Sequence, residues 1–421
     1  MSIYRTSTAN SYDVTLQNIN RRSAALATQQ ERLSSGKRVL RASDDAVAAT
    51  LSERAQNRQA RVEADKRALE ASRSALTQAE SAMGEATDIL HNVRELMVQA
   101  GNPSLGASER KDLALQLSGL RDQMLGVANR ADTSGLTLFG GLGGADQPFV
   151  DTYNANGGTV SFKGQAGQYL PTTNSLPHAI DGNAAWMQVP AGNGTFTATL
   201  SSSNLGQLRT DLGSYAGATP LPTPLQAGGP GYSIKFTSDT TFQILDNTTP
   251  PGTPIPMDGD TSAGPYSYTF TADKTISFAN GVNLQLQGAP KSGDQVDIKP
   301  ADQPTNIFQT INDTIAALNA SQTNQAANLT QQVGRGLKEV DAGMDQILAA
   351  RGRLGEWLKR ADSMSTLLED RSVAYQKENS DLTDLDLVKG ISDFQTQQTA
   401  LDAALKSYSS VQKLSLFQYI A

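Results

Sequence analysis

Histidine and cysteine, the side chains that most often carry catalysis or bind metals, are almost absent from this chain. Its 421 residues include two histidines and no cysteine. His91 lies in a helical pattern two positions before Val93, which favours a solvated helix residue, and His178 follows Pro177 with no second histidine nearby. The sequence has no His-Glu-x-x-His motif and no nucleophile elbow, so it excludes a zinc peptidase and gives no basis for a Ser-His-Asp hydrolase.

Three other motifs resemble ligand sites only in part. The run Phe139-Gly-Gly-Leu-Gly-Gly144 lacks the Lys-Ser/Thr of a nucleotide loop, and we interpret it as a hinge. Acidic residues interleave with Arg54, Arg58, Arg61 and Arg67, which favours a salt-bridged helix face over a phosphate site. The stretch 258–261 lacks the glutamate that closes a calcium loop. We therefore expect no enzyme, no metal site and no cofactor.

The composition restricts the partners. The formal charge is −7 and the isoelectric point about 5.0, which argues against nucleic acid or an anionic membrane as the main partner. No stretch approaches the roughly 20 apolar residues that span a bilayer. The first residues lack the apolar core of a secretory signal peptide, so we expect any export to use another route.

The distribution of proline and glycine divides the chain into three zones. Every proline except Pro103 and Pro304 lies between residues 140 and 303, where most of the Gly and Thr also occur. This division predicts an α+β multidomain fold, in which an antiparallel helical, coiled-coil core built from both termini carries an inserted β-rich domain. The predicted domains are paired terminal helices at 1–45 and 380–421, a helical bundle at 46–139 and 304–379, and an outer β-rich insert at 140–303.

The helical zones carry heptad repeats, in which apolar residues alternate in steps of three and four. Ser43 before two aspartates predicts a capped helix start, and the pattern predicts a helix from about Ala46 to Ala100 and another after Ser108. The first helix has an apolar residue at every seventh position from Val62 to Met97. The C-terminal zone has a matching stripe between Val333 and Leu368, which Arg351 interrupts.

The two ends of the chain carry weaker stripes of the same kind. The N-terminal stripe, which Ser23 and Gln30 dilute, contains Tyr12, Leu16, Ile19, Leu26 and Leu33. The C-terminal stripe, which Gln398 dilutes, contains Ile391, Phe394, Leu401, Leu405 and Tyr408. Isolated helices with such thin stripes are marginal in water. We infer that the two ends pair with each other and that neighbouring copies complete their burial.

The middle zone alternates short β patterns with turn signals. The predicted strands are Gly158–Lys163, Thr195–Leu200, Tyr232–Thr237, Thr241–Leu245, Tyr266–Thr271, Thr275–Phe278, Val282–Gln287 and Asp294–Ile298. They suit two packed sheets or a small barrel, and the pattern does not give the strand order.

Several segments together resemble the flagellin superfamily. Residues 32–46, from Arg32-Leu-Ser-Ser-Gly to Ser-Asp-Asp-Ala46, are similar to the family signature before the long helix. Residues 129–141 are similar to the family's exit from its N-terminal helices, and Arg351-Gly-Arg-Leu-Gly-Glu-Trp357 to its C-terminal helix. Within the superfamily, residues 289–298 and the segment from Gln397 to the ending Leu414-Ser-Leu-Phe-Gln-Tyr-Ile420 resemble the proteins of the hook–filament junction.

The resemblance implies a structural adaptor of the bacterial flagellum that is exported through the flagellar type III channel and becomes extracellular. It implies four partners: hook-associated protein 1 on the hook side, flagellin on the filament side, copies of the chain in a ring, and a cytoplasmic export chaperone. Leu416, Phe417 and Tyr419 of the ending would belong to the assembly surface. The alternatives are a flagellin proper, a glycan-binding or enzymatic insert on a filament scaffold, and a helical signalling protein of the chemoreceptor type.

Overall fold

The computed structural model describes residues 8–420, except residues 103, 144, 154–157, 173–174 and 321–325. It divides into two compact units, one made of the chain up to Ala68 together with Ser363 onward, the other of Leu69–Asp362. Two long helices, α2 (Ala46–Ala100) and α5 (Ala326–Thr383), each contribute to both units. The division falls inside these helices, so the predicted domain boundaries at 45 and 380 stay a prediction.

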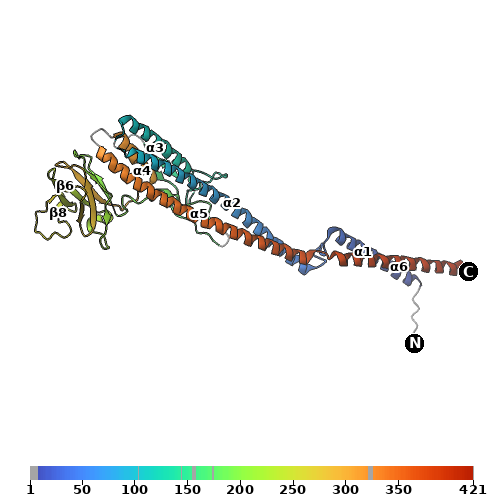
Figure 1. Ribbon diagram of the computed structural model, residues 1–421. Coiled ribbons are helices and arrows are strands. Elements are labelled where there is room, and N and C mark those ends of the chain that lie inside the picture. Colours follow the sequence, from blue (N-terminus) through green and yellow to red (C-terminus); the bar gives the residue numbers. More distant parts are fainter. Residues whose placement is uncertain are drawn as a thin grey trace. The chain divides into compact units, whose positions relative to one another are not determined.

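The first unit pairs sequence-distant segments (Figure 1). Helix α1 (Thr8–Ser35) packs against α6 (Leu387–Ile420), and the start of α2 lies along the end of α5. Between α2 and α5, the Ser52 hydroxyl donates to the Asn379 amide oxygen at 2.6 Å, and Arg58 forms an ion pair with Glu378 at 3.2 Å. The N-terminal and C-terminal parts of the chain therefore pair, as predicted for a helical core built from both termini.

A turn held by two aspartates begins α2. The Asp45 carboxylate accepts the Ala48 backbone N–H at 2.9 Å, and Asp44 accepts those of Leu40 and Arg41 at 3.1 and 3.0 Å. These backbone hydrogen bonds are the main reason that the pKa of each carboxyl lies below its ordinary value. The predicted cap at Ser43 is wrong, because the helix begins at Ala46 and Asp45 holds the capping position.

The helices of the second unit bury the predicted heptads. α3 (Ala107–Ala128) and α4 (Ile307–Ala320) pack together beside α2 and α5 (Figure 1). On the part of α2 in this unit, the residues predicted to face the core are buried, and Val62, in the first unit, is buried too; the buried residues of the second unit are Leu69, Leu76, Ala79, Met83, Ala86, Leu90, Val93, Met97 and Ala100. Arg351, which interrupts the α5 stripe, forms an ion pair with Glu80 of α2 at 2.7 Å. α3 begins at Ala107 rather than after Ser108, because Glu109 accepts the Gly106 N–H at 2.6 Å.

Two antiparallel sheets form the insert. One has the order β3-β12-β6-β7-β8, with β9 beside β7, and the other has β10-β11-β4, with β5 beside β11. The strands are β3 (Phe196–Leu200), β4 (Arg209–Thr210), β5 (Ser214–Tyr215), β6 (Tyr232–Phe236), β7 (Thr241–Asp246), β8 (Thr253–Ile255), β9 (Tyr268–Thr269), β10 (Thr275–Phe278), β11 (Val282–Gln287) and β12 (Gln295–Pro300). Both sheets contribute to one hydrophobic core between Phe196 and Ile298, which fits the predicted two-sheet packing.

The predicted strands occur, with the exception that Tyr266–Thr271 shrinks to the two residues of β9. The missed strands are β4, β5, β8 and β1 (Phe149–Asp151), which pairs with β2 (Val160–Phe162). Each of these four has at most three residues, too few for an alternating pattern to be visible in the sequence.

The segment between residues 139 and 190 packs with the helices rather than with the sheets. Trp186 lies in a one-turn π-helix, Asn183–Met187, and its ring is 5.6 Å from that of Phe139 and 6.4 Å from that of Phe308 on α4. Phe149 of β1 joins the same cluster. The prediction of 140–303 as one β-rich insert is therefore wrong at its N-terminal side: the sandwich core starts at Phe196.

Gly140 and Gly141, which follow Phe139, form a packed turn rather than the predicted hinge, and Gly144 lies outside the described residues. Gly141 is buried with φ of 74°, a conformation that favours glycine. A Cβ placed on Gly141 would lie 2.1 Å from the Gln165 carbonyl oxygen, and the Gly141 N–H donates to the Ile180 carbonyl at 3.0 Å. The run thus fixes the start of the 139–190 segment against its neighbours.

Candidate assembly surface of the terminal helices

Six half-buried apolar side chains lie along the α1–α6 pair. They recur every seventh residue on both helices, and we call them the terminal seam: Ile19, Leu26 and Leu33 of α1, and Phe394, Leu401 and Tyr408 of α6. The two helices run antiparallel, because the end of α1 meets the start of α6. This heptad spacing is that of a two-helix coiled-coil contact.

A polar contact fixes the register of this pair. The buried Gln29 amide donates to the backbone carbonyl of Gly390, 361 positions away in the chain, at 3.1 Å. A Cβ placed on Gly390 would lie 2.8 Å from Leu385 and 3.4 Å from Leu33, so glycine permits the close approach of α1. Neither residue stands out in the sequence pattern. The predicted stripes include Gln30 and Gln398, but both are exposed, whereas Gln29 is buried and Gln397 is half-buried.

The turns that precede α2 and α6 hold each other through backbone hydrogen bonds. The Arg38 N–H donates to the Thr383 carbonyl at 2.7 Å, and the Leu385 N–H donates to the Gly36 carbonyl at 2.9 Å. The Arg38 guanidinium adds a 2.7 Å hydrogen bond to the Leu382 carbonyl. These contacts join the connection between α1 and α2 to the connection between α5 and α6.

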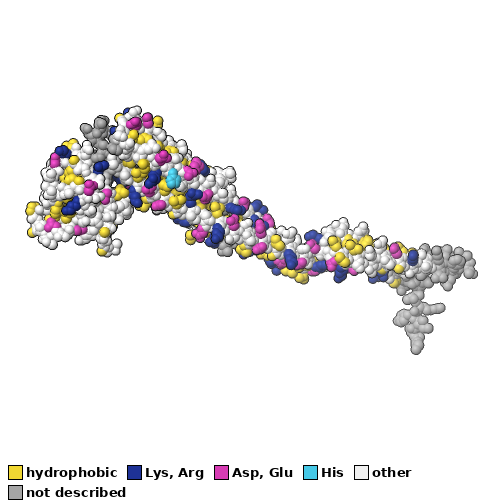
Figure 2. Space-filling model, in the orientation of Figure 1, with side chains coloured by type: hydrophobic (Ala, Val, Ile, Leu, Met, Phe, Trp, Pro, Cys, Tyr) yellow, Lys and Arg dark blue, Asp and Glu magenta, His cyan; other side chains and the backbone are white. Residues whose placement is uncertain are grey.

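Other apolar residues of the two predicted stripes face solvent. Leu16, Ile391 and Leu405 are 41%, 49% and 46% exposed, and further exposed apolar side chains on these helices belong to Val14, Leu387 and Val388. Figure 2 shows hydrophobic side chains at the surface of this helix pair. The side chains of Tyr12, Leu416, Phe417 and Tyr419 lie outside the described residues. The pair therefore leaves an apolar surface, separate from the terminal seam, that a second molecule could cover.

Two side chains singled out from the sequence for possible chemistry, His178 and Asp258, have structural contacts in the described residues. Ser72 Oγ lies 3.2 Å from His178 Nε2, but Ser72 is only 3% exposed and also bonds the Leu176 carbonyl, so the hydroxyl holds a loop in place. His91 is exposed, and Asp258 accepts two backbone N–H groups of a turn. Within the described ranges, no group of three His, Cys, Asp or Glu could hold a metal, and no helix could span a membrane.

Two family models match the chain. The bacterial flagellin N-terminal helical region matches residues 6–143, and the bacterial flagellin C-terminal helical region matches residues 337–420, which together exceed half of the chain. The chain belongs to the flagellin superfamily. The two matched ranges contain every residue of the terminal seam.

Relatives within the superfamily differ in how much of the chain they match. Flagellar hook-associated protein 3 of Escherichia coli (strain K12) is 24% identical over 98% of this chain and 99% of its own length. The flagellin of Bacillus subtilis is 33% identical, over 30% of this chain and 42% of its own length.

Solved structures show the same fold. The flagellar junction protein FlgL from Legionella pneumophila has a TM-score of 0.63 at 26% identity, covering 74% of this chain and 99% of that one. FlgL from Xanthomonas campestris has a TM-score of 0.64 at 25% identity, covering 78% of this chain and 99% of that one.

Proposed function

We propose that this chain is a structural subunit of the bacterial flagellum that joins the hook to the filament. The observation that carries the proposal is the length of the match: hook-associated protein 3 aligns along 98% of the chain, β insert included. The flagellins align over 28–30% of it. Because flagellin-type ends occur in both groups, similarity that continues through the insert favours the junction protein over the bulk filament subunit.

The terminal helices supply the assembly contact in this proposal. The terminal seam packs α1 against α6, whereas Leu16, Ile391 and Leu405 are exposed and can pack against a neighbouring subunit. Fully burying such a side chain contributes about 1.5–3 kcal/mol, and roughly half of that remains available for each. Several of these per copy give a contact that forms only in an existing assembly, which suits an adaptor added to a finished hook.

The proposed partners are hook-associated protein 1 on the hook side, flagellin on the filament side, further copies in a ring, and an export chaperone in the cytoplasm. The proposed location is the extracellular flagellum, reached through the type III channel, with the terminal helices on the inside and the β insert facing outward. We propose a structural role and not a catalytic one, because the apolar surface of the terminal helices suits assembly.

A flagellin proper is the alternative, in which the same helices would support unlimited growth. Growth without limit requires a head-to-tail contact that never closes between copies of one chain. Purified protein that extends into long filaments from its own seeds would support that alternative. Protein that stays monomeric in the presence of such seeds supports the junction proposal.

The experiment replaces one seam residue and compares it with a matched position. In cells lacking the gene, the Leu401→Asp variant should leave hooks without filaments, because a carboxylate in the half-buried terminal seam loses part of its hydration. Thr399→Asp adds the same charge two residues away, on an exposed part of α6, and should restore filaments. Full-length filaments on Leu401→Asp cells would contradict the role of the seam.

A further inference from the structure

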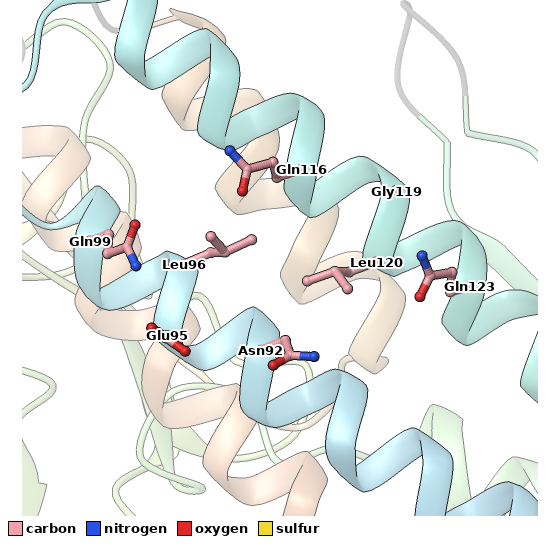
Figure 3. A pocket seen from close by; sticks show the side chains of 8 residues that line it. All are labelled: Asn92, Glu95, Leu96, Gln99, Gln116, Gly119, Leu120 and Gln123. Atoms are coloured by element: carbon pink, nitrogen blue, oxygen red, sulfur yellow. The ribbon is translucent and has the colours of Figure 1, made fainter.

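A groove of about 390 Å³ runs between α2 and α3 (Figure 3). Leu96 and Leu120 project into it from the two helices. The polar lining comes from amides and one carboxylate: Asn92, Glu95, Gln99, Gln116 and Gln123. We call this feature the amide groove. Its lining offers hydrogen-bond acceptors above an apolar floor, the environment that suits a long side chain with a cationic head and an aliphatic stem.

Carboxylates lie on the groove side of both helices. Glu95 is the only charged residue in its lining. One turn beyond either end, Asp88 precedes Asn92 by four residues and Asp112 precedes Gln116 by four, which places both carboxylates on the groove side of their helices. All three are exposed, and no ion pair among the described residues involves any of them. These three carboxylates give the groove side of the two helices a negative charge that no ion pair in the described part of the chain offsets.

A basic surface lies on the first half of α2. Arg54, Asn57, Arg58 and Arg61 lie on one face of the helix and line a shallow depression of about 300 Å³. Arg58 is engaged within its own chain, 3.2 Å from Glu378 and over the ring of Tyr375.

Arg54 and Arg61 differ from Arg58. Both are exposed, and neither has an ion pair in the part of the chain that the structure describes. We call this surface the arginine face.

The free charges of the two surfaces have equal spacing. Arg54 and Arg61 are seven residues apart, as are Asp88 and Glu95, and seven residues of helix rise about 10.5 Å. Two arginines on one helix can therefore meet two carboxylates on another at the same time. Two coupled pairs over an apolar floor are more specific than isolated surface ion pairs, which contribute little.

We propose that the amide groove of one copy receives the arginine face of a second copy. The proposal rests on the proposed function, since it identifies one contact between copies within the ring. The contact is heterologous, because groove and face are different surfaces of one chain, and each copy can therefore give its face to one neighbour and its groove to another. The arginine stems cover Leu96 and Leu120, while the guanidinium groups bond the carboxylates and amides of the rim.

A charge exchange tests the identity of the occupant. The variant with Arg54→Glu and Arg61→Glu should lose most filament attachment in cells that otherwise lack the gene. Adding Asp88→Arg and Glu95→Arg to the same chain should restore it, because every groove then meets a face of opposite sign. Circular dichroism of each purified variant shows whether it is folded. No restoration by a folded fourfold variant would overturn the proposal and would indicate a different partner in the groove.

Disulfide trapping tests the geometry directly, because the chain has no cysteine of its own. Cells that co-express the Arg61→Cys and Glu95→Cys variants should give a crosslinked dimer in isolated flagella. Arg67→Cys with Glu95→Cys is the control, since Arg67 is also an exposed arginine of α2 but lies about 120° around the helix from Arg61. We expect several-fold more dimer from the first pair. Equal crosslinking of both pairs would overturn the proposal, whereas absence of the chain from the flagella would refute the proposed function instead.

Discussion

The position of the boundary between the helical part and the β insert leads to a quantitative prediction. Removing residues 196–300 should leave the helices folded, because the Ala301 N–H donates to the Thr195 carbonyl at 3.0 Å and the two ends can be joined by a short Gly/Ser linker. Removing residues 145–300 also deletes Phe149 and Trp186, which are 1% and 0% exposed in the cluster with Phe139 and Phe308.

The cost of the longer deletion follows from that burial. Truncating one core aromatic costs about 3–5 kcal/mol, which lowers the unfolding temperature by roughly 6–20 °C in a domain of this size. The loss of both aromatics approaches the total stability of a typical domain, about 5–15 kcal/mol. The longer deletion should therefore already be partly unfolded at temperatures where the shorter deletion is still folded. It should also lack the cooperative thermal transition that the shorter deletion shows.

Far-ultraviolet circular dichroism measures both effects. The shorter deletion should have a higher helix fraction than the full chain and one cooperative thermal transition. The longer deletion should have lower helicity and a broad transition at reduced temperature. Equal unfolding temperatures for the two deletions would refute the assignment of residues 139–190 to the helical part.

Three further predictions concern single residues. Burial raises the pKa of the Glu339 carboxyl above its ordinary value of 4.5, so the contribution of Glu339 to stability is present at acidic pH and is lost as the pH rises through the raised pKa. The Glu339→Gln variant should not show this loss, and its free energy of unfolding in urea should match or exceed that of the parent at neutral pH. The Gly390→Ala variant should weaken the α1–α6 pair and lower the unfolding temperature. The Gly352→Ala variant should instead stabilise its helix by about 0.5–1 kcal/mol and raise the unfolding temperature, because a Cβ at that position meets nothing within 4 Å. Asp151→Ala should cost roughly 2–4 kcal/mol in the same assay, because it removes the 2.6 Å partner of the buried Arg121 guanidinium; an unchanged stability would contradict the importance of that pair.

The sequence predicted best those features that repeat along a helix. The heptads of α2 place Leu76, Met83 and Leu90 in the core, because a large buried face imposes its period on many consecutive residues. The helix bounds Ala46 and Ala100 follow from the same pattern and the stop at Gly101.

Features that depend on distant contacts could not be read in this way. On α1, positions 29 and 30 both fit a heptad built on Ile19, Leu26 and Leu33, and the hydrogen bond to Gly390 selects Gln29. Nothing local to either residue reveals that partner.

The composition of the middle zone separated loops from helices, but it did not indicate which core each loop packs against. Phe149 and Trp186 lie in Gly- and Pro-rich sequence and yet belong with the helices. Composition therefore predicted the insert correctly and its first boundary incorrectly.

Electron microscopy of isolated flagella with this chain labelled tests the central claim most directly. If the chain joins hook to filament, the label should occur only in a short zone where the two meet, and flagella of the Leu401→Asp strain should lack it. Label distributed along the filament would contradict the junction role and would identify the chain as a filament subunit.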